Sequence, residues 1–206
     1  MSWLADSRTS VAAEKILDAA AELFVRDGVA AVGMNEIAKA AGCSRATLYR
    51  YFENREALHI AYVHREARSI TQQVATDVIG IDDPAERLVE AMLISLSMVR
   101  ENPALSAWFR PGEHFGGSFG LHSEVINAMV SAFVSSDSVA PESTLTHLKA
   151  KWYVRVIVSL LAYPEDNPED ERTLLTEFVA PMISADANPI PAAPARSGES
   201  ATKRAR

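Results

Sequence analysis

The segment from Ser44 to Tyr51 carries a dense set of side chains that can bind nucleic acid. Arg45, Thr47 and Tyr49 stand at alternate positions within it. An arginine can donate two hydrogen bonds to a guanine edge, and hydroxyl-bearing side chains can bond phosphate while their apolar parts contact a thymine methyl. These three are the predicted base-contacting residues. Ser44 can cap the helix that carries them by accepting a backbone hydrogen bond.

Two short helices joined at Gly42 would position these side chains. Ile37 and Ala41 lie four residues apart on one stripe of the first helix, and glycine supplies the permissive backbone that ends it. In the second helix Leu48 and Phe52 repeat at the same spacing and are predicted to face a core. The exposed face of the second helix is then free to enter a DNA groove.

The segment AGCSRATLYRYFENREAL resembles the signature of tetracycline-repressor-type (TetR family) transcription regulators, and the resemblance extends over about residues 10 to 60. Periodicity and helix-breaking residues predict an all-α fold of about nine helices, and the resemblance implies how they are organised. An N-terminal three-helix, helix-turn-helix DNA-binding domain would precede a helical ligand-binding and dimerisation domain. It implies a DNA-binding regulator rather than an enzyme, and repression is the commoner mode of the family.

The resemblance adds further DNA contacts. Tyr51 and Arg55 match the phosphate-contacting positions of the family, and Arg55 would stand near a helix N-terminus that favours anions. Asn35 aligns with a position that sometimes reaches DNA, and a solvated side chain is the equal alternative. Arg50 is either a DNA contact or a solvated or intramolecularly paired arginine. The complete predicted DNA-binding set is Asn35, Ser44, Arg45, Thr47, Tyr49, Arg50, Tyr51 and Arg55.

Three residues depart from the family pattern. Gly33 stands where a helix-capping, phosphate-contacting threonine is usual, Ala46 stands for glycine, and Cys43 stands for valine. Cys43 is interpreted as a small packed hydrophobe, with a redox switch as the alternative. Tyr49 likewise has an alternative, in which its ring packs against the first helix.

Composition limits the class of protein. The chain has 206 residues, 48% of them hydrophobic, and one cysteine, which fits a reducing cytoplasm. Its first residues, MSWLADSR, lack the basic and apolar runs of a secretory signal, and the apolar stretch 152–163 is shorter than the roughly 20 residues that span a bilayer. We therefore expect a cytoplasmic protein without a membrane partner.

The net charge of −7 is unevenly distributed. Residues 1–60 carry −1, residues 61–185 carry −8, and the tail from 186 carries +2. Within 42–55 three arginines oppose one glutamate. This pattern predicts a small basic patch on an acidic body that repels DNA elsewhere, with weak, salt-sensitive non-specific binding.

Other function classes find little support in the sequence. The five histidines show no metal-ligand spacing, and no glycine loop of the phosphate-binding type is present, so no metal and no cofactor are predicted. Glu113 and His114 form the nearest approach to a catalytic loop but lack a nucleophile. A helical scaffold that binds protein through the motif is a third class.

Helix signals divide the chain into three parts, 1–54 as the DNA-binding domain, 55–185 as the effector-binding and dimerisation domain, and 186–206 as a disordered tail. Helices are predicted at about 10–27, 55–78, 121–135, 141–163 and 168–184, and residues 111–120 as an irregular glycine-rich segment. Asp83-Pro84, Asn102-Pro103 and Asn167-Pro168 predict further helix starts, because each joins a capping residue to a first-turn proline.

The resemblance implies that the last two helices form a homodimer. A single recognition helix covers only a few base pairs, so a two-fold related copy and a palindromic double-stranded DNA operator are expected. The apolar stripes suited to this role, or alternatively to the monomer core, are Leu145, Leu148, Trp152, Val156, Ser159, Tyr163, Leu174, Leu175, Phe178 and Met182.

The resemblance also implies a pocket for a small-molecule effector, whose binding would swing the helix from Arg55 and release DNA. A largely apolar effector fits the aromatic content best. Candidate walls are Met92, Leu96, Trp108, Phe109, Phe115, Phe119, Met129, Phe133 and Trp152, and candidate polar anchors are His114, Tyr153 and Arg155. Ordinary core packing is the alternative for most of them.

Overall fold

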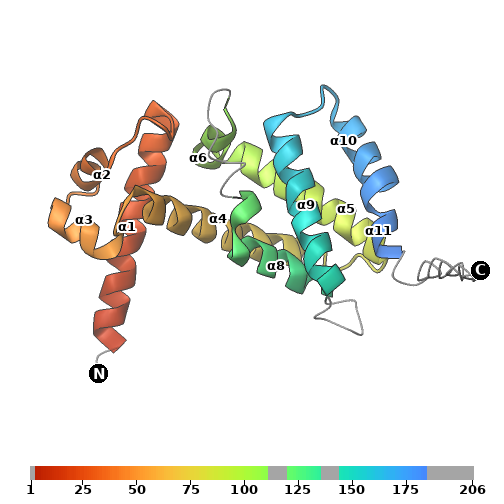
Figure 1. Ribbon diagram of the computed structural model, residues 1–206, viewed down its shortest axis with the longest axis horizontal. Coiled ribbons are helices and arrows are strands. Elements are labelled where there is room, and N and C mark those ends of the chain that lie inside the picture. The colour runs from red at the N-terminus through yellow and green to blue at the C-terminus, as the bar shows by residue number, and fades with distance from the viewer. Residues whose placement is uncertain (1–2, 111–119, 136–143, 185–206) are drawn as a thin grey trace, which may run out of the picture.

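A computed structural model describes residues 3–110, 120–135 and 144–184 of the chain, and every regular element in these ranges is a helix (Figure 1). The all-α prediction is confirmed. Helices α1 to α3 gather at one end of the molecule and α5 and α8 to α11 at the other. The long helix α4 runs from the first group into the second.

The first group consists of α1 (Trp3–Asp27), α2 (Met34–Ala40) and α3 (Arg45–Tyr51). The first helix begins at Trp3 rather than at the predicted Ser10, because no proline or glycine interrupts the intervening residues. Ile37, Leu48 and Phe52 are buried in a common core, as predicted from their spacing.

Two glycines with positive φ shape this group. Gly28 (φ 82°) follows α1 and Gly42 (φ 65°) follows α2. The amide of Gly42 donates to Lys39 O at 3.2 Å and the amide of Cys43 to Ala38 O at 3.0 Å. These two bonds form a Schellman motif, which requires a left-handed residue where Gly42 stands and fixes the turn into α3.

Helix α4 (Arg55–Asp77) begins where the sequence predicts, with Asn54 as its N-cap; Asn54 Oδ1 accepts from Ala57 N at 2.8 Å. The next helix, α5 (Pro84–Glu101), begins after Asp83, whose carboxylate accepts from Glu86 N at 2.9 Å. Asn102 caps α6 (Pro103–Ser106), and the 3₁₀ helix η1 (Ala107–Phe109) follows directly. Both proline-marked starts are confirmed.

The remaining helices are α8 (Glu124–Ser135), α9 (Thr144–Ala162) and α10 (Pro168–Leu174). The predicted single helix 168–184 is interrupted. The π-helical η2 (Leu175–Val179) follows α10, Ala180 N donates to Leu175 O at 2.9 Å, and α11 (Pro181–Ser184) is the last described element. Pro181 explains the interruption, since it has no N–H and its ring would clash with the carbonyl four residues before it.

A salt bridge fastens α10 to α5. Arg100 donates to both carboxylate oxygens of Glu171, at 2.6 and 2.8 Å, and to Leu160 O at 3.1 Å. Glu171 is buried, and the hydrogen bonds from Arg100 hold the pKa of its carboxyl below the usual value. Three helices, α5, α9 and α10, are therefore joined at one guanidinium.

Candidate nucleic-acid interface

The N-terminus of α3 is organised by a pair of hydroxyl groups. Ser44 Oγ accepts from Thr47 N at 3.1 Å and lies 2.9 Å from Thr47 Oγ1. The predicted cap is therefore confirmed. The pair fixes the first turn of α3, where unpaired backbone N–H groups and the helix dipole favour an anion such as phosphate.

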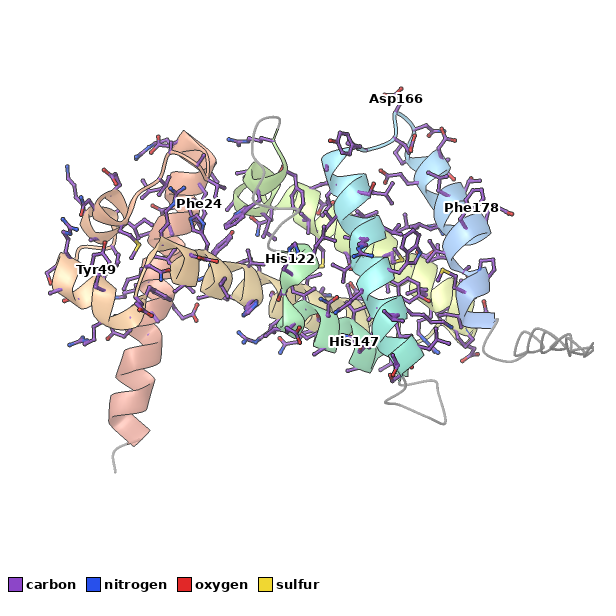
Figure 2. All side chains as sticks on the ribbon, in the orientation of Figure 1. Phe24, Tyr49, His122, His147, Asp166 and Phe178 are labelled. Carbon is purple, nitrogen blue, oxygen red and sulfur yellow. The ribbon has the colours of Figure 1, made fainter. Side chains whose placement is uncertain are left out.

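Arg45 and Tyr49 form the exposed face of α3. The guanidinium carbon of Arg45 lies 5.7 Å from the centre of the Tyr49 ring, one helical turn away, in a cation–π contact. The Tyr49 residue is 41% exposed and stands at the outer end of the molecule (Figure 2), as a DNA contact requires. The two side chains present a guanidinium and a phenol to solvent together.

Arg50 and Tyr51 form a second pair. The Arg50 guanidinium lies 5.2 Å from the centre of the Tyr51 ring, and Arg50 Nη2 donates to Tyr51 Oη at 3.4 Å. Tyr51 is half-buried against the core of α1 to α3, whereas Arg50 is exposed. Arg50 is thus paired within the molecule, and its contact with DNA stays a prediction.

Asn35 is exposed on α2, the helix that begins after Gly33. Gly33 is the N-cap and makes no side-chain hydrogen bond, as expected for a glycine in place of threonine. A Cβ built on Gly33 would come within 2.7 Å of Glu36 Oε2, the far end of a flexible side chain in the first turn of α2. Glu36 therefore lies close to the position that a threonine side chain would take.

Arg55 has different partners from the phosphate that the resemblance implies. Its Nη2 donates to Val29 O at 2.7 Å and to Ala30 O at 2.8 Å, both in the turn after α1. Arg55 therefore ties the start of α4 to α1. These bonds give Arg55 a structural role that the sequence did not indicate, and its contact with a DNA phosphate stays a prediction.

Cys43 is a free, half-buried cysteine whose side chain packs against the core of α1 to α3. This environment agrees with the interpretation as a small packed hydrophobe.

An aromatic cluster joins this domain to the rest of the molecule. Phe24 of α1 makes edge contacts with His59, Tyr62 and Trp108, each at 5.4 Å between ring centres. Tyr62 and Trp108 are stacked, 5.9 Å apart with an angle of 8° between their planes. The pKa of His59 is lowered to about 4, mainly by burial and to a smaller extent by the charge of Arg55, so its ring is neutral at pH 7. From the sequence, neither His59 nor Tyr62 was expected in such a cluster. Their three-residue spacing on one helix is the only local signal that could have indicated it.

An apolar cavity of about 150 Å³ adjoins this cluster, between α4, α5, η1, α8 and α9. Trp108 and Phe109 line it, as predicted. A smaller cavity of about 60 Å³ adjoins it and shares lining residues with it, including Thr71 and Ser95. Four further residues predicted for the pocket line this smaller cavity: Met92, Met129, Phe133 and Tyr153.

Other predicted pocket residues lie elsewhere. Leu96 is buried in the core of the second group of helices and lines neither cavity. Trp152 and Arg155 are exposed on α9, which corrects their assignment, because the inward stripe of α9 passes through Tyr153, Val154 and Ile157 instead. His114, Phe115 and Phe119 lie outside the described residues.

One lining residue carries a charge and was missed from the sequence. Glu66 of α4 lines the larger cavity, and the other lining residues in the described ranges are uncharged. No local pattern marks Glu66, since a glutamate in a long amphipathic helix is usually solvated.

Metal-binding and membrane-spanning features are absent from the part of the chain that the structure describes. It contains no group of three or more His, Cys, Asp or Glu side chains placed to hold a metal ion. Nor does any helix there combine the length and the apolar character needed to cross a membrane.

Known proteins share both the sequence and the helix arrangement of this chain. A profile of bacterial regulatory proteins, tetR family, matches residues 16–62. An HTH-type transcriptional regulator of Mycobacterium tuberculosis strain H37Rv is 48% identical over 186 residues, which cover 88% of this chain and 90% of the relative.

Two solved structures share the fold. The TetR family repressor AlkX from Dietzia sp. superposes with a TM-score of 0.61 at 24% identity, covering 82% of this chain and 94% of AlkX. A TetR transcriptional regulator from Rhodococcus sp. RHA1 superposes with a TM-score of 0.64 at 18% identity, covering 86% of this chain and 97% of the regulator. At these identities the likeness concerns the arrangement of helices.

Proposed function

Because this chain belongs to the TetR family of bacterial transcriptional regulators, we propose that α3 is its recognition helix and lies in the major groove of an operator. Arg45, Thr47 and Tyr49 would meet base edges there. The observation that carries this proposal is the exposed, capped first turn of α3, with Arg45 and Tyr49 held against each other at its outer face.

Phosphate contacts would come from the flanks of that helix. Ser44 stands at its N-terminus, Arg50 and Tyr51 at its C-terminal end, and Asn35 on the neighbouring helix α2. Each side chain can donate a hydrogen bond, and such contacts set the register of a protein on DNA without reading its sequence. Arg55 is left out of this set because of its two carbonyl partners.

A second copy of the chain would supply the other half of the interface. Large apolar side chains are exposed on α9 and η2, and these elements carry the stripes expected for dimerisation. Phe178 is 71% exposed and Trp152 is 46% exposed, and Leu145 and Leu148 lie on the same outward stripe of α9 as Trp152. Burying this surface between two copies would remove it from water and place two recognition helices on one palindromic operator.

The effector would occupy the apolar cavity beside Trp108. Its lining is contributed partly by α4, the helix that leads back to α1 to α3. A small, largely apolar ligand that prefers the conformer unable to bind DNA would shift the population and release the operator, with a coupling of about 1 to 3 kcal/mol. The protein would then act as a ligand-released repressor.

A mobility-shift titration tests the DNA-binding proposal, with duplex from the promoter region beside the protein's own gene as probe. Arg45→Ala should weaken specific binding by about 1 to 3 kcal/mol for each half-site, because a bidentate base contact is lost there. The charge-matched control is Arg68→Ala, at an exposed position on α4. Failure of the wild-type protein to retain any duplex at low ionic strength would refute the proposal, and so would equal loss in the two variants.

A further inference from the structure

The larger cavity has one charged group in its described wall. Glu66 of α4 reaches it, and the other polar side chains along that wall are Thr71 and Ser95, with tryptophan and aliphatic or aromatic groups around them. The Glu66 side chain is 16% exposed. A carboxylate in such surroundings attracts a hydrogen-bond donor or a cation and repels an anion.

The carboxylate of Glu66 keeps acceptor capacity beyond its side-chain partners. Oε1 accepts from Arg65 Nε at 2.9 Å and lies 2.9 Å from Arg65 Nη2. Oε2 accepts a long hydrogen bond, 3.3 Å, from Asn102 Nδ2. A carboxylate offers about four lone-pair sites, so Oε2 can take a further donor.

Arg65 carries the same network out of the cavity and onto α1. Its Nη1 donates to Glu14 Oε2 at 3.0 Å and to Asp18 Oδ1 at 2.7 Å. Burial alone would lower the pKa of Arg65, yet the hydrogen bonds from its guanidinium to these carboxylates and to Glu66 raise it. One guanidinium thus holds three carboxylates, one on the cavity wall and two on the first helix of the DNA-binding domain.

A second connection runs beside the first. The Arg65 guanidinium lies 5.4 Å from the centre of the Tyr62 ring, and Tyr62 is stacked on Trp108, which lines the same cavity. Displacement of Glu66 by a ligand would therefore act on Arg65 directly, and displacement of Trp108 would act on it through Tyr62.

We propose that Glu66 is the polar anchor of the effector cavity and that it selects an apolar molecule bearing one cationic hydrogen-bond donor, such as an amine. Binding of this donor to Glu66 loosens the contacts between Arg65 and α1. The inference rests on the proposed function, since it names the ligand class and the link to DNA binding of the same cavity. An anionic head group would face the Glu66 carboxylate, and no basic side chain lines the described wall. Arg65, which pairs with Glu66, is shared with two carboxylates of α1.

Three eight-carbon probes that differ only in the head group test the selection: octylamine, 1-octanol and octanoate, each titrated calorimetrically into the full-length protein at pH 7. Octylamine should bind at least about tenfold more tightly than octanoate, with octanol between them. Glu66→Gln is close in shape and removes the charge, so it should abolish the preference for amine over octanol. The control Asp77→Asn makes the same change of charge at an exposed site on α4 and should keep the preference.

The link to α1 is tested by retention of the operator fragment in the presence of octylamine. The amine should weaken retention by the wild-type protein. In Asp18→Asn it should still bind calorimetrically but weaken retention less, because Arg65 is already held less firmly to α1. Thermal melting of each variant shows whether it is folded.

Several results would overturn the inference. They are tightest binding of octanoate, equal binding of all three probes, binding of none, or a preference for amine that survives Glu66→Gln. Retention of DNA without any probe is measured separately, so the DNA-binding proposal can stand when the Glu66 inference falls, and the probe ranking can stand when DNA binding fails.

Discussion

Arg55 offers the sharpest test of the structure, because sequence and structure give it different roles. Its Nη2 donates to two backbone carbonyls in the turn after α1, Val29 O at 2.7 Å and Ala30 O at 2.8 Å. Arg55→Ala removes both hydrogen bonds and leaves the carbonyls behind. The variant should therefore lose folding stability rather than a contact with DNA alone.

The expected loss follows from the two bonds. A hydrogen bond from a charged donor contributes about 1.5 to 3 kcal/mol, and the bond to Ala30 is exposed and shares a nitrogen with the bond to Val29. We therefore expect Arg55→Ala to lower the free energy of unfolding by about 2 to 4 kcal/mol. Arg45→Ala, which removes an exposed arginine of α3, should change it by less than about 0.5 kcal/mol.

Urea unfolding at a fixed protein concentration measures both values, because the stability of a dimer depends on concentration. The salt dependence of DNA retention is measured in parallel. If Arg55 were a phosphate clamp, its loss from both copies of the dimer would reduce the slope of log affinity against log salt by about 1.8, which is about 0.9 per contact, and leave stability unchanged. That pair of results would refute the role of Arg55 as a tie between α4 and α1.

Two further predictions concern His59 and the outward face of α9 and η2. The pKa of His59 is lowered to about 4, by burial first and by the charge of Arg55 second, so the unfolded chain binds the extra proton as pH falls below about 6.5. The free energy of unfolding should therefore fall between pH 6.5 and 4, by up to about 3 kcal/mol from this residue. His59→Phe should flatten that part of the plot of unfolding free energy against pH. An unchanged plot would contradict the assignment. Phe178→Arg combined with Trp152→Arg should convert a dimer into a monomer in sedimentation equilibrium. The control Ile79→Arg changes an apolar residue that is 86% exposed just beyond the end of α4, and it should leave the dimer intact. Equal masses for the wild-type protein, the double variant and the control would exclude this face as the interface.

The helix-turn-helix could be predicted from the sequence almost in full. Gly42 ends α2 with positive φ, Ser44 caps α3, and Leu48 faces the core, as their spacing indicates. The pocket could be predicted only in part. Trp108 and Phe109 line the larger cavity, whereas Trp152 is exposed on the opposite face of α9. An aromatic residue signals apolar contact but not which neighbour provides it.

The sequence by itself determined where three of the helices begin, because Asp83, Asn102 and Asn167 bond to backbone groups only two or three residues away. Such contacts form whenever the local chain is helical, whatever the rest of the molecule does. Tertiary structure decided the partners of Arg55 and the two partners of Arg65 on α1, which lie from 25 to 51 residues away in the chain. Packing of whole helices brings those groups together, and the local spacing of residues does not predict which helices pack against each other.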